Sequence, residues 1–237
     1  MGKVLWFPTL TAVGLLATPP GVGAEGREGA DSSWVSDFSL ERSDMAANGR
    51  NPFFILEPGY QLVLEGSDAR ATITVKPDVR MIDGVETRVV EASEMQGGEL
   101  IEVCQNYFAV SEKTNDVFCF GQDVDIYLGG RVVAHDGSWM AGAGGAKCGL
   151  KLQARPRPNT RHYQELAPGV AMARAEVLDV GATVITPAGE FKNCVHIIET
   201  TPLMRSQIVH EWYAPRIGLV QRDSLMLVKY GESRGTK

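Results

Sequence analysis

The stretch HEWYAPRIGLV, at residues 210–220, bears on the fold more directly than any other part of the chain. Its first half is rich in aromatic side chains, which favour strands. The Ala-Pro-Arg sequence at residues 214–216 then predicts a tight turn. Apolar residues return at 217–220 and again at 225–228, so the sequence predicts strands that follow this turn and pair back on the first.

The chain from residue 51 onward carries the same kind of signal. Alternating or β-branched runs occur at residues 60–65, 71–75, 85–91, 100–110, 117–120, 170–180, 183–185, 195–199 and 208–213. Turn residues separate them, as at Asp83-Gly84 and at residues 113–116. No long apolar stripe of helical period interrupts the pattern. Because the connections are too short for crossover helices, we expect a mainly all-β fold with an antiparallel sheet.

The first 24 residues predict an export signal. Lys3 is the only charged residue there, residues 4–17 are largely apolar, and the small residues at 22–24 match a cleavage site. The apolar run is shorter than the roughly 20 residues that span a bilayer. We therefore expect a signal peptide at 1–24, a polar flexible leader at 25–50 and a single antiparallel β domain at 51–237. The expected location is periplasmic or secreted, with no membrane span after signal removal.

The charge balance bears on the partners of the protein. The chain has 29 acidic and 23 basic residues, which gives a net charge of −6. A negative chain is poorly suited to nonspecific binding of nucleic acid, whose phosphates repel it. We therefore expect no nucleic-acid partner, and the sequence leaves the oligomeric state open.

Four cysteines lie beyond the predicted signal. An even number in an oxidising compartment favours disulfides, and four cysteines allow three connectivities. Cys104 and Cys119 flank one predicted hairpin and are local neighbours. We therefore expect Cys148 to pair with Cys194, and Cys104 with Cys119.

Several stretches resemble the motifs of a family of exported bacterial β proteins of unassigned function. Residues 51–60 resemble its N-P-[FY]-[FL]-P-L-x-P-G opening, and residues 212–220 its W/Y-Y-A-P-G-x-G-L-V ending. Residues 118–124, 137–149 and 163–171 resemble motifs between these ends. The resemblance implies a strongly twisted antiparallel sheet or half-barrel, like that of bacterial lipoprotein carriers. Arg216 stands where the family motif has Gly, which speaks against a turn that needs a positive φ there.

Residues 137–149 form a long Gly-rich loop without a strand signal. A loop this rich in Gly is costly to order, and Trp139 offers one large apolar anchor that offsets part of this cost by burial. We expect this loop to close over a cavity on the concave face of the sheet. The candidate contacts of a hydrophobic ligand are four aromatic residues: Trp139, Tyr163, Trp212 and Tyr213.

A metal site is the best chemical alternative. Cys194 and His196 are two residues apart and face the same side of a strand, while His210 lies on the next strand. In one register His196 faces His210 directly and Cys194 lies opposite Trp212. Thiolate and imidazole ligands on one sheet face suit copper or zinc. The competing interpretation is a packed pair of histidines beside a disulfide.

Catalytic motifs are weak in this chain. It has no G-x-S-x-G sequence, and His135, Asp136 and Ser138 are too close in sequence to converge as a triad. We therefore assign no catalytic residue. The leading hypothesis is an exported envelope protein that binds a hydrophobic or lipid-like ligand in a sheet concavity, without catalysis or cofactor. The alternatives are a periplasmic copper or zinc binding protein, and an enzyme with its site at the Trp139 loop.

Overall fold

The computed structural model describes residues 34–233, apart from the side chain of Arg205. The predicted signal peptide and residues 25–33 of the predicted leader lie outside this range. Within it, about two thirds of the residues lie in strands, and the one helix is the short 3-10 turn η1 (Arg42–Asp44). The prediction of a mainly all-β, antiparallel fold is confirmed. No helix among residues 34–233 is long and apolar enough to cross a membrane.

The strands are of two kinds, long ones that build the wall of the fold and short ones at its seams. The long strands are β4 (Tyr60–Glu65), β5 (Ala69–Ile82), β6 (Val85–Gln96), β7 (Glu99–Ser111), β8 (Val117–Leu128), β11 (Lys147–Leu152), β14 (Arg174–Thr186), β15 (Gly189–Thr201), β16 (Met204–Ala214), β17 (Gly218–Arg222) and β18 (Leu225–Glu232). The short strands are β1 (Met45–Ala46), β2 (Arg50–Asn51), β3 (Phe54–Ile55), β9 (Arg131–Ala134), β10 (Trp139–Met140), β12 (Arg161–Tyr163) and β13 (Glu165–Leu166).

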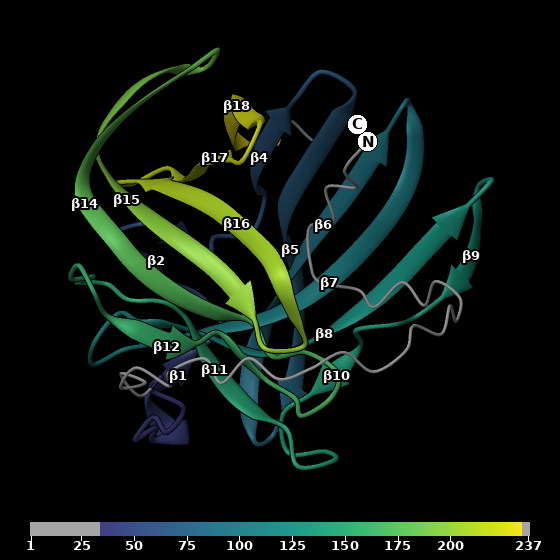
Figure 1. Cartoon of the computed structure of the whole chain (residues 1–237). Coiled ribbons are helices and arrows are strands. Elements are labelled where there is room, and N and C mark those ends of the chain that lie inside the picture. Colours follow the sequence, from purple (N-terminus) through teal and green to yellow (C-terminus); the bar gives the residue numbers. More distant parts are fainter. Residues whose placement is uncertain (1–33, 234–237) are drawn as a thin grey trace, which may run out of the picture.

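The sheet curls into a nearly closed barrel (Figure 1). Its strand order is β12-β14-β15-β16-β17-β18-β4-β5-β6-β7-β8-β11-β13. The two end strands, β12 and β13, are separated in sequence only by Gln164, so the two ends of the sheet meet. Register shifts, as between Val75 and Val79 and between Val177 and Asp179, bend the long strands around the interior. The expected half-barrel is therefore closed further than the sequence indicated.

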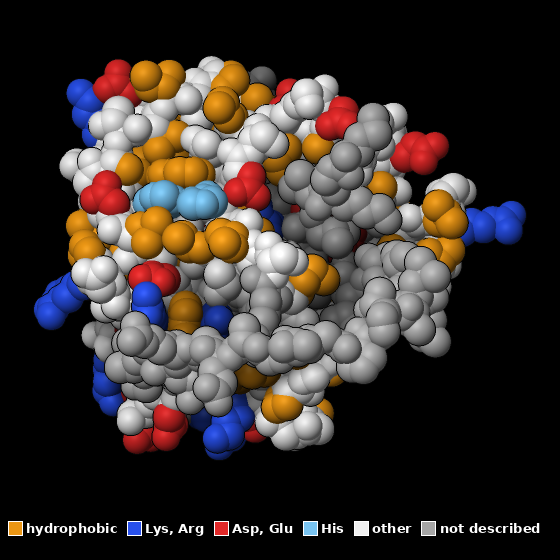
Figure 2. Space-filling model, in the orientation of Figure 1, with side chains coloured by type: hydrophobic (Ala, Val, Ile, Leu, Met, Phe, Trp, Pro, Cys, Tyr) orange, Lys and Arg blue, Asp and Glu red, His pale blue; other side chains and the backbone are white. Residues whose placement is uncertain are grey.

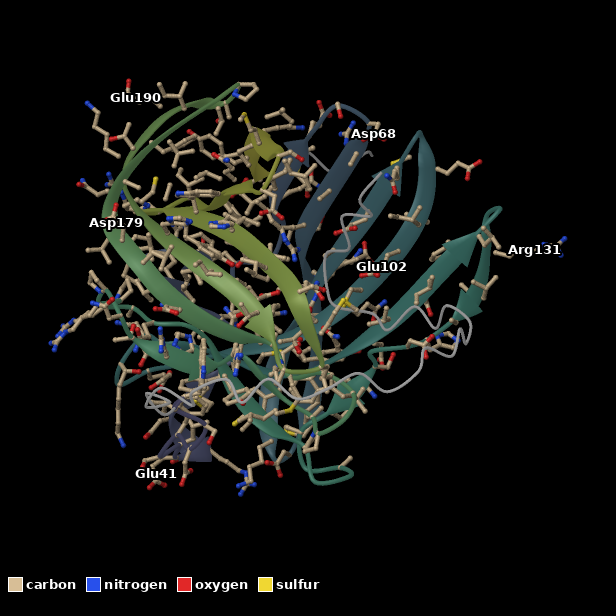
Figure 3. The ribbon with its side chains drawn as sticks, viewed as in Figure 1. Glu41, Asp68, Glu102, Arg131, Asp179 and Glu190 are labelled. Atoms are coloured by element: carbon tan, nitrogen blue, oxygen red, sulfur yellow. The ribbon has the colours of Figure 1, made fainter. Side chains whose placement is uncertain are left out.

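Tight turns join the long strands in the predicted places. Asp83 and Gly84 both have positive φ, 47° and 77°, which suits the two-residue hairpin between β5 and β6. Asn115, at φ 60°, makes the predicted turn between β7 and β8. Charged side chains mark the tips of the hairpins at one end of the barrel, with Asp68, Arg131 and Glu190 labelled in Figure 3.

Residues 34–50, which we expected to belong to a mobile leader, pack on the barrel. Val35 forms a parallel bridge with His162, and β1 pairs with the end of β7. The side chains of Phe38 and Leu40 contact the buried cluster that contains Phe118 and Phe120. The folded domain therefore includes a segment that lies before the predicted boundary at residue 51, because this segment carries enough apolar side chains to cover an end of the core.

The predicted disulfides are absent, and all four cysteines are free. Cys104 lies opposite Val124, whereas Cys119 lies opposite Phe108, so about 13 Å of strand separates them. A disulfide needs Cα atoms within roughly 7 Å. Cys148 pairs with Glu165 at the seam of the barrel, and the Cys194 thiol donates to the carbonyl oxygen of Phe191 at 3.4 Å. The prediction of a Cys104–Cys119 disulfide was wrong because the two residues, although on adjacent strands of one hairpin, are not paired with each other in the ladder.

Arg216→Gly is expected to stabilise the protein by about 1 kcal/mol, since a side chain in the left-handed region costs roughly that much. Arg216 has φ 63°, although the sequence predicted no positive φ at a residue with a side chain. Its backbone N–H donates to the carbonyl oxygen of Pro52 at 2.6 Å. Urea unfolding measures the change. The same substitution at Arg131, which lies in β9, serves as the control and is expected to destabilise. A loss of stability in Arg216→Gly would contradict the assignment of strain to this turn.

Candidate functional site

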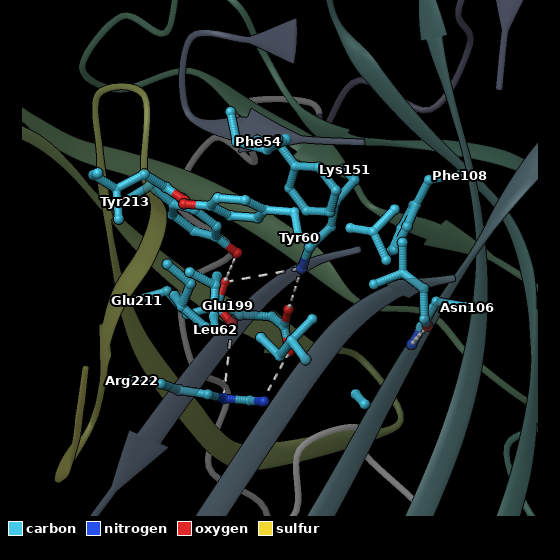
Figure 4. A pocket seen from close by; sticks show the side chains of 18 residues that line it. Phe54, Tyr60, Leu62, Asn106, Phe108, Lys151, Glu199, Glu211, Tyr213 and Arg222 are labelled. Carbon is cyan, nitrogen blue, oxygen red and sulfur yellow. Dashed lines mark hydrogen bonds and ion pairs between the residues drawn. The ribbon is translucent and has the colours of Figure 1, made fainter. Parts of the chain in front are cut away.

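A cavity lies inside the barrel where its two apolar clusters meet. The side chains of Phe54, Tyr60 and Ile73 pack against both clusters and line the cavity. Phe108 and Leu219 add to this apolar wall. The space that water can reach in it measures about 60 Å³, and the whole recess, including the part open to solvent, about 660 Å³. Figure 4 shows aromatic rings around the cavity and charged groups at one end of it.

Two segments that lie far apart in sequence meet at the cavity. One is the β2–β3 hairpin, and the other is the turn between β16 and β17, at residues 214–218. The Tyr60 hydroxyl donates to the carbonyl oxygen of Ile217 at 2.9 Å. A Cβ atom on Gly218, which has φ 106°, would lie 3.4 Å from the Leu62 side chain. The opening and closing motifs of the sequence therefore meet at the cavity.

Two cations and two carboxylates form a buried cluster at the polar end of the cavity. Lys151 Nζ lies 3.5 Å from Glu199 Oε2 and 3.9 Å from Glu211 Oε2. Arg222 reaches the same carboxylates from the other side, with Nη2 3.9 Å from Glu199 Oε1 and Nε 3.7 Å from Glu211 Oε1 (Figure 4). The Tyr213 hydroxyl donates to Glu211 Oε2 at 2.7 Å. We call Lys151, Glu199, Glu211 and Arg222 the charged cluster.

The charged cluster is electrically balanced, and its members set each other's pKa values. Burial alone would raise the pKa of Glu211, but Lys151, Arg222 and the Tyr213 hydroxyl lower it below its usual range. Burial raises the pKa of Glu199, and the neighbouring Glu211 adds to this rise. Burial opposes the charge of Lys151, yet the two carboxylates raise its pKa above the usual value. Glu211 therefore stays ionised, and Glu199 is the carboxylate that protonates first.

The polar end of the cavity contains long ion pairs and one buried amide oxygen without a partner among the described residues. The four ion-pair distances of the charged cluster, 3.5 to 3.9 Å, are longer than a good charge-assisted hydrogen bond of about 2.8 Å. Asn106 donates through Nδ2 to the carbonyl oxygen of Val90, while its buried Oδ1 has no partner among the described residues. Buried polar atoms without a partner are costly, so this end suits a polar group of a ligand or an ordered water.

A smaller recess continues from the charged cluster toward the seam of the barrel. It is lined by Lys151, Glu199, Asn106 and Glu165, among others. Burial raises the pKa of Glu165 to about 7, and the charge of Glu199 adds to this, while Lys151 acts in the opposite direction. Glu165 pairs with Cys148 across the seam, so an acidic group that changes charge near neutral pH lies at the closure of the sheet.

Glu165→Gln is expected to gain stability relative to the native protein as the pH rises. The pKa of Glu165 is raised from 4.5 to about 7 in the folded state. Between these values the folded protein holds a proton that the unfolded chain has lost, so the native protein loses stability with rising pH. Glutamine carries no such proton. The difference in the free energy of unfolding should grow by about 2–3 kcal/mol from about pH 4.5 to about pH 8.

Urea unfolding of both proteins across this pH range measures that difference. His162, whose pKa burial lowers to about 4, is present in both proteins, so its effect cancels in the comparison. Glu112→Gln, at an exposed position, is the matched control. A difference that is constant with pH would contradict a raised pKa at Glu165.

The structure places the four predicted ligand contacts in different environments. Tyr213 lines the cavity. Trp212 is its neighbour on β16 and therefore points to the other side of the sheet, where its ring stacks on His196 at 4.2 Å. Tyr163 contacts Trp34, with ring centroids 6.3 Å apart, and does not line the cavity.

Trp139 and its loop do not cover the cavity, contrary to the expected lid. Trp139 is 6% exposed and packs in the cluster that contains Phe118 and Phe120. Short strand β10 pairs Trp139 with Gln122 and Met140 with Gly121, which fixes the start of the loop to β8. No residue of 137–149 lines the cavity. The loop is held in place by the ladder and by burial of its Trp, so it cannot act there as a lid.

Of the predicted metal ligands, the structure brings the two histidines together. His196 Nε2 lies 2.9 Å from His210 Nδ1. Their register differs from the predicted one by two residues, because His196 pairs with Trp212 and Ile198 pairs with His210. A shift of two keeps every side chain on its face, so the contact persists. Cys194 is fully buried at a bend beside Asn193, and no group of three metal-binding side chains is found in the described part of the chain.

The charged cluster was missed by the sequence analysis, although the alternation of the strands contained a signal for it. Glu199 shares a strand face with the buried Ile197, and Glu211 shares a face with Tyr213. Arg222 likewise follows the buried Val220 by two residues. Charged residues at core positions of three adjacent strands point to a buried polar site. Lys151 carries no such signal, because the residue two positions before it is Gly149, which has no side chain to mark a buried face.

Comparisons of the chain with protein-family models, with curated proteins and with solved structures found no match.

Proposed function

We propose that this is an exported, non-catalytic binding protein that holds a small hydrophobic or lipid-like ligand in the cavity. The observation that carries the proposal is the combination of apolar walls with a buried, balanced charged cluster at one end. Small-molecule sites are typically apolar pockets with a few fixed polar groups that orient the ligand. The aromatic side chains of Phe54, Tyr60 and Phe108 supply the apolar walls. The charged cluster and Asn106 supply the fixed polar groups.

The chemistry of the polar end favours a ligand with an uncharged polar group. Cations and carboxylates lie together at this end, so either charge on a ligand would meet a like charge at close range. A hydroxyl or amide group can donate to the free Oδ1 of Asn106 or to a carboxylate and accept from Lys151. We therefore infer an apolar body with a hydroxyl or amide end.

The size of the recess limits the ligand. A volume of about 60 Å³ holds only a few waters, at roughly 10–15 Å³ each. This enclosed volume is smaller than the roughly 300–1,000 Å³ that small-molecule sites occupy. A ligand longer than the enclosed part must extend past the β2–β3 hairpin or displace it. Phe54 and Ile55, which form β3, are the residues of that hairpin that line the cavity.

A displacement experiment tests the proposal. The neutral fluorescent probe N-phenyl-1-naphthylamine is bound to the purified protein and then displaced by 1-octanol, octanoate or octylamine. We expect 1-octanol to compete best. Tyr213→Phe removes the hydroxyl that holds Glu211, and it should weaken 1-octanol binding about tenfold, as loss of one buried hydrogen bond does.

Tyr163→Phe is the matched control, because Tyr163 lies outside the cavity, and its affinity for 1-octanol should equal that of the native protein. Equal weakening in both variants would place the bound molecule elsewhere. Stronger competition by octanoate or octylamine would keep the cavity as the site but reject the uncharged end group.

A further inference from the structure

A pair of histidines stands on the outer face of the barrel, away from the cavity. His196 on β15 and His210 on β16 are diagonal neighbours, and His196 Nε2 lies 2.9 Å from His210 Nδ1. Figure 2 shows the two rings side by side at the surface, with apolar side chains above and below them. Ile208, which is 56% exposed, lies two residues before His210 on β16 and so points to the same face. The pair is therefore reachable from solvent, and it lies beside Asp179 and Asp223 as well as apolar side chains.

Both imidazole rings stack on the same indole, and their own planes are tilted by 31° to one another. The His196 ring stacks on Trp212 with centroids 4.2 Å apart and planes 10° apart, and the His210 ring lies 5.9 Å from the same indole at 21°. The backbone of His210 is fixed to the β17–β18 turn, because its N–H donates to Asp223 Oδ1 at 2.9 Å. Stacking and backbone bonds restrict both imidazoles before any ligand arrives, which lowers the entropic cost of binding one.

The separation of the two nitrogens matches two adjacent ligands of a metal ion. Imidazole nitrogens bind transition metals at about 2.0–2.1 Å. Two such ligands at a right angle are about 2.8–3.0 Å apart, whereas two ligands of a tetrahedral centre are about 3.3 Å apart. The observed 2.9 Å fits the right-angled pair of a square or tetragonal centre. Among divalent first-row ions, Cu²⁺ both prefers that geometry and binds nitrogen ligands most tightly.

We propose that His196 and His210 form a surface site for Cu²⁺, bound through His196 Nε2 and His210 Nδ1. On binding, the imidazole that donates its N–H changes tautomer, so that it carries a proton on its other ring nitrogen, and the ion lies between the two freed nitrogens. Water completes the coordination. Cys194 takes no part, because its buried thiol is bonded to the Phe191 carbonyl oxygen.

Electron paramagnetic resonance of the purified protein with one equivalent of Cu²⁺ tests this site. The native protein should give a tetragonal copper signal with hyperfine splitting from two nitrogens. His196→Gln and His210→Gln should each lose one of the two nitrogens and bind Cu²⁺ at least tenfold more weakly. His135→Gln is the matched control, since His135 is exposed and paired with Asp125 at 2.8 Å on another strand, and it should leave the signal unchanged.

Two results would overturn the site. One is a native spectrum that shows only hydrated copper, and the other is a protein-bound signal that survives in both histidine variants. Circular dichroism of each variant checks that the fold is kept. Because the pair lies on the outer face, displacement of N-phenyl-1-naphthylamine from the cavity should be the same with and without Cu²⁺, so failure of one proposal does not decide the other.

Discussion

Replacing Lys151 by Met is expected to lower the free energy of unfolding by about 3–5 kcal/mol, the usual cost of leaving a buried charge without its partner. Lys151 lies between Glu199 and Glu211, which would then share Arg222 alone. Both carboxylates are nearly inaccessible to solvent, so water cannot replace the lost ammonium group. Urea unfolding at neutral pH measures the loss.

Two further variants make this result specific to the charged cluster. Lys147→Met, at an exposed position on the same strand, is the matched control and should change stability by less than about 0.5 kcal/mol. Adding Glu199→Gln to Lys151→Met removes one of the two carboxylates and should restore part of the stability. A small loss in Lys151→Met, comparable with that in Lys147→Met, would show that the ion pairs contribute little and that water fills this end of the cavity.

Trp139→Ala is expected to cost about 3–5 kcal/mol of stability and to leave binding to the cavity unchanged in the fraction that stays folded. The ring is 6% exposed and belongs to the cluster with Phe118 and Phe120, so its removal leaves a void that the strands cannot fill. Thermal unfolding measures the cost, and titration with N-phenyl-1-naphthylamine measures the binding.

The matched control for Trp139→Ala is Trp212→Ala, on the partly exposed outer face. That variant should lose less stability, because less of the indole is buried. A mild effect of Trp139→Ala together with weakened probe binding would restore the lid that the sequence suggested. The structure predicts the opposite pattern, with Trp139 as a core residue.

The strands and their turns were predictable from the sequence because both signals are local. Alternation along residues 195–199 reports one buried face, and Asp83-Gly84 supplies the two positive φ values of a tight hairpin. The closure of the barrel was not predictable in this way. It depends on β12 and β13, which have only three and two residues, too few to show a period.

Pairings between strands were harder to predict than the strands themselves. The predicted pairing of His196 with His210 was wrong by two residues. Bulges such as the one after Thr200 shift which residues pair across two strands, and no residue pattern in the sequence reveals them. The same uncertainty in strand pairing made the predicted disulfides wrong. Cys104 and Cys119 are close in sequence, yet their places in the ladder differ by four residues.

The site was only partly predictable. Tyr213 was named as a ligand contact and lines the cavity, and the histidine contact was expected. Four residues of the charged cluster were missed, because charged side chains are read as solvent-facing unless burial is known. Whether Glu199 and Lys151 face each other depends on how far the sheet curls, and that is set by the sum of many small bends rather than by any one residue.

Binding of N-phenyl-1-naphthylamine to the native protein and to Ala92→Leu tests the central claim most directly. Ala92 is 4% exposed and lines the cavity from β6, so the larger side chain fills space that a ligand needs. With circular dichroism showing both proteins folded, we predict saturable one-to-one binding to the native protein, reversed by 1-octanol, and at least tenfold weaker binding to the variant. Equal affinity in the two proteins would contradict a ligand site inside the barrel.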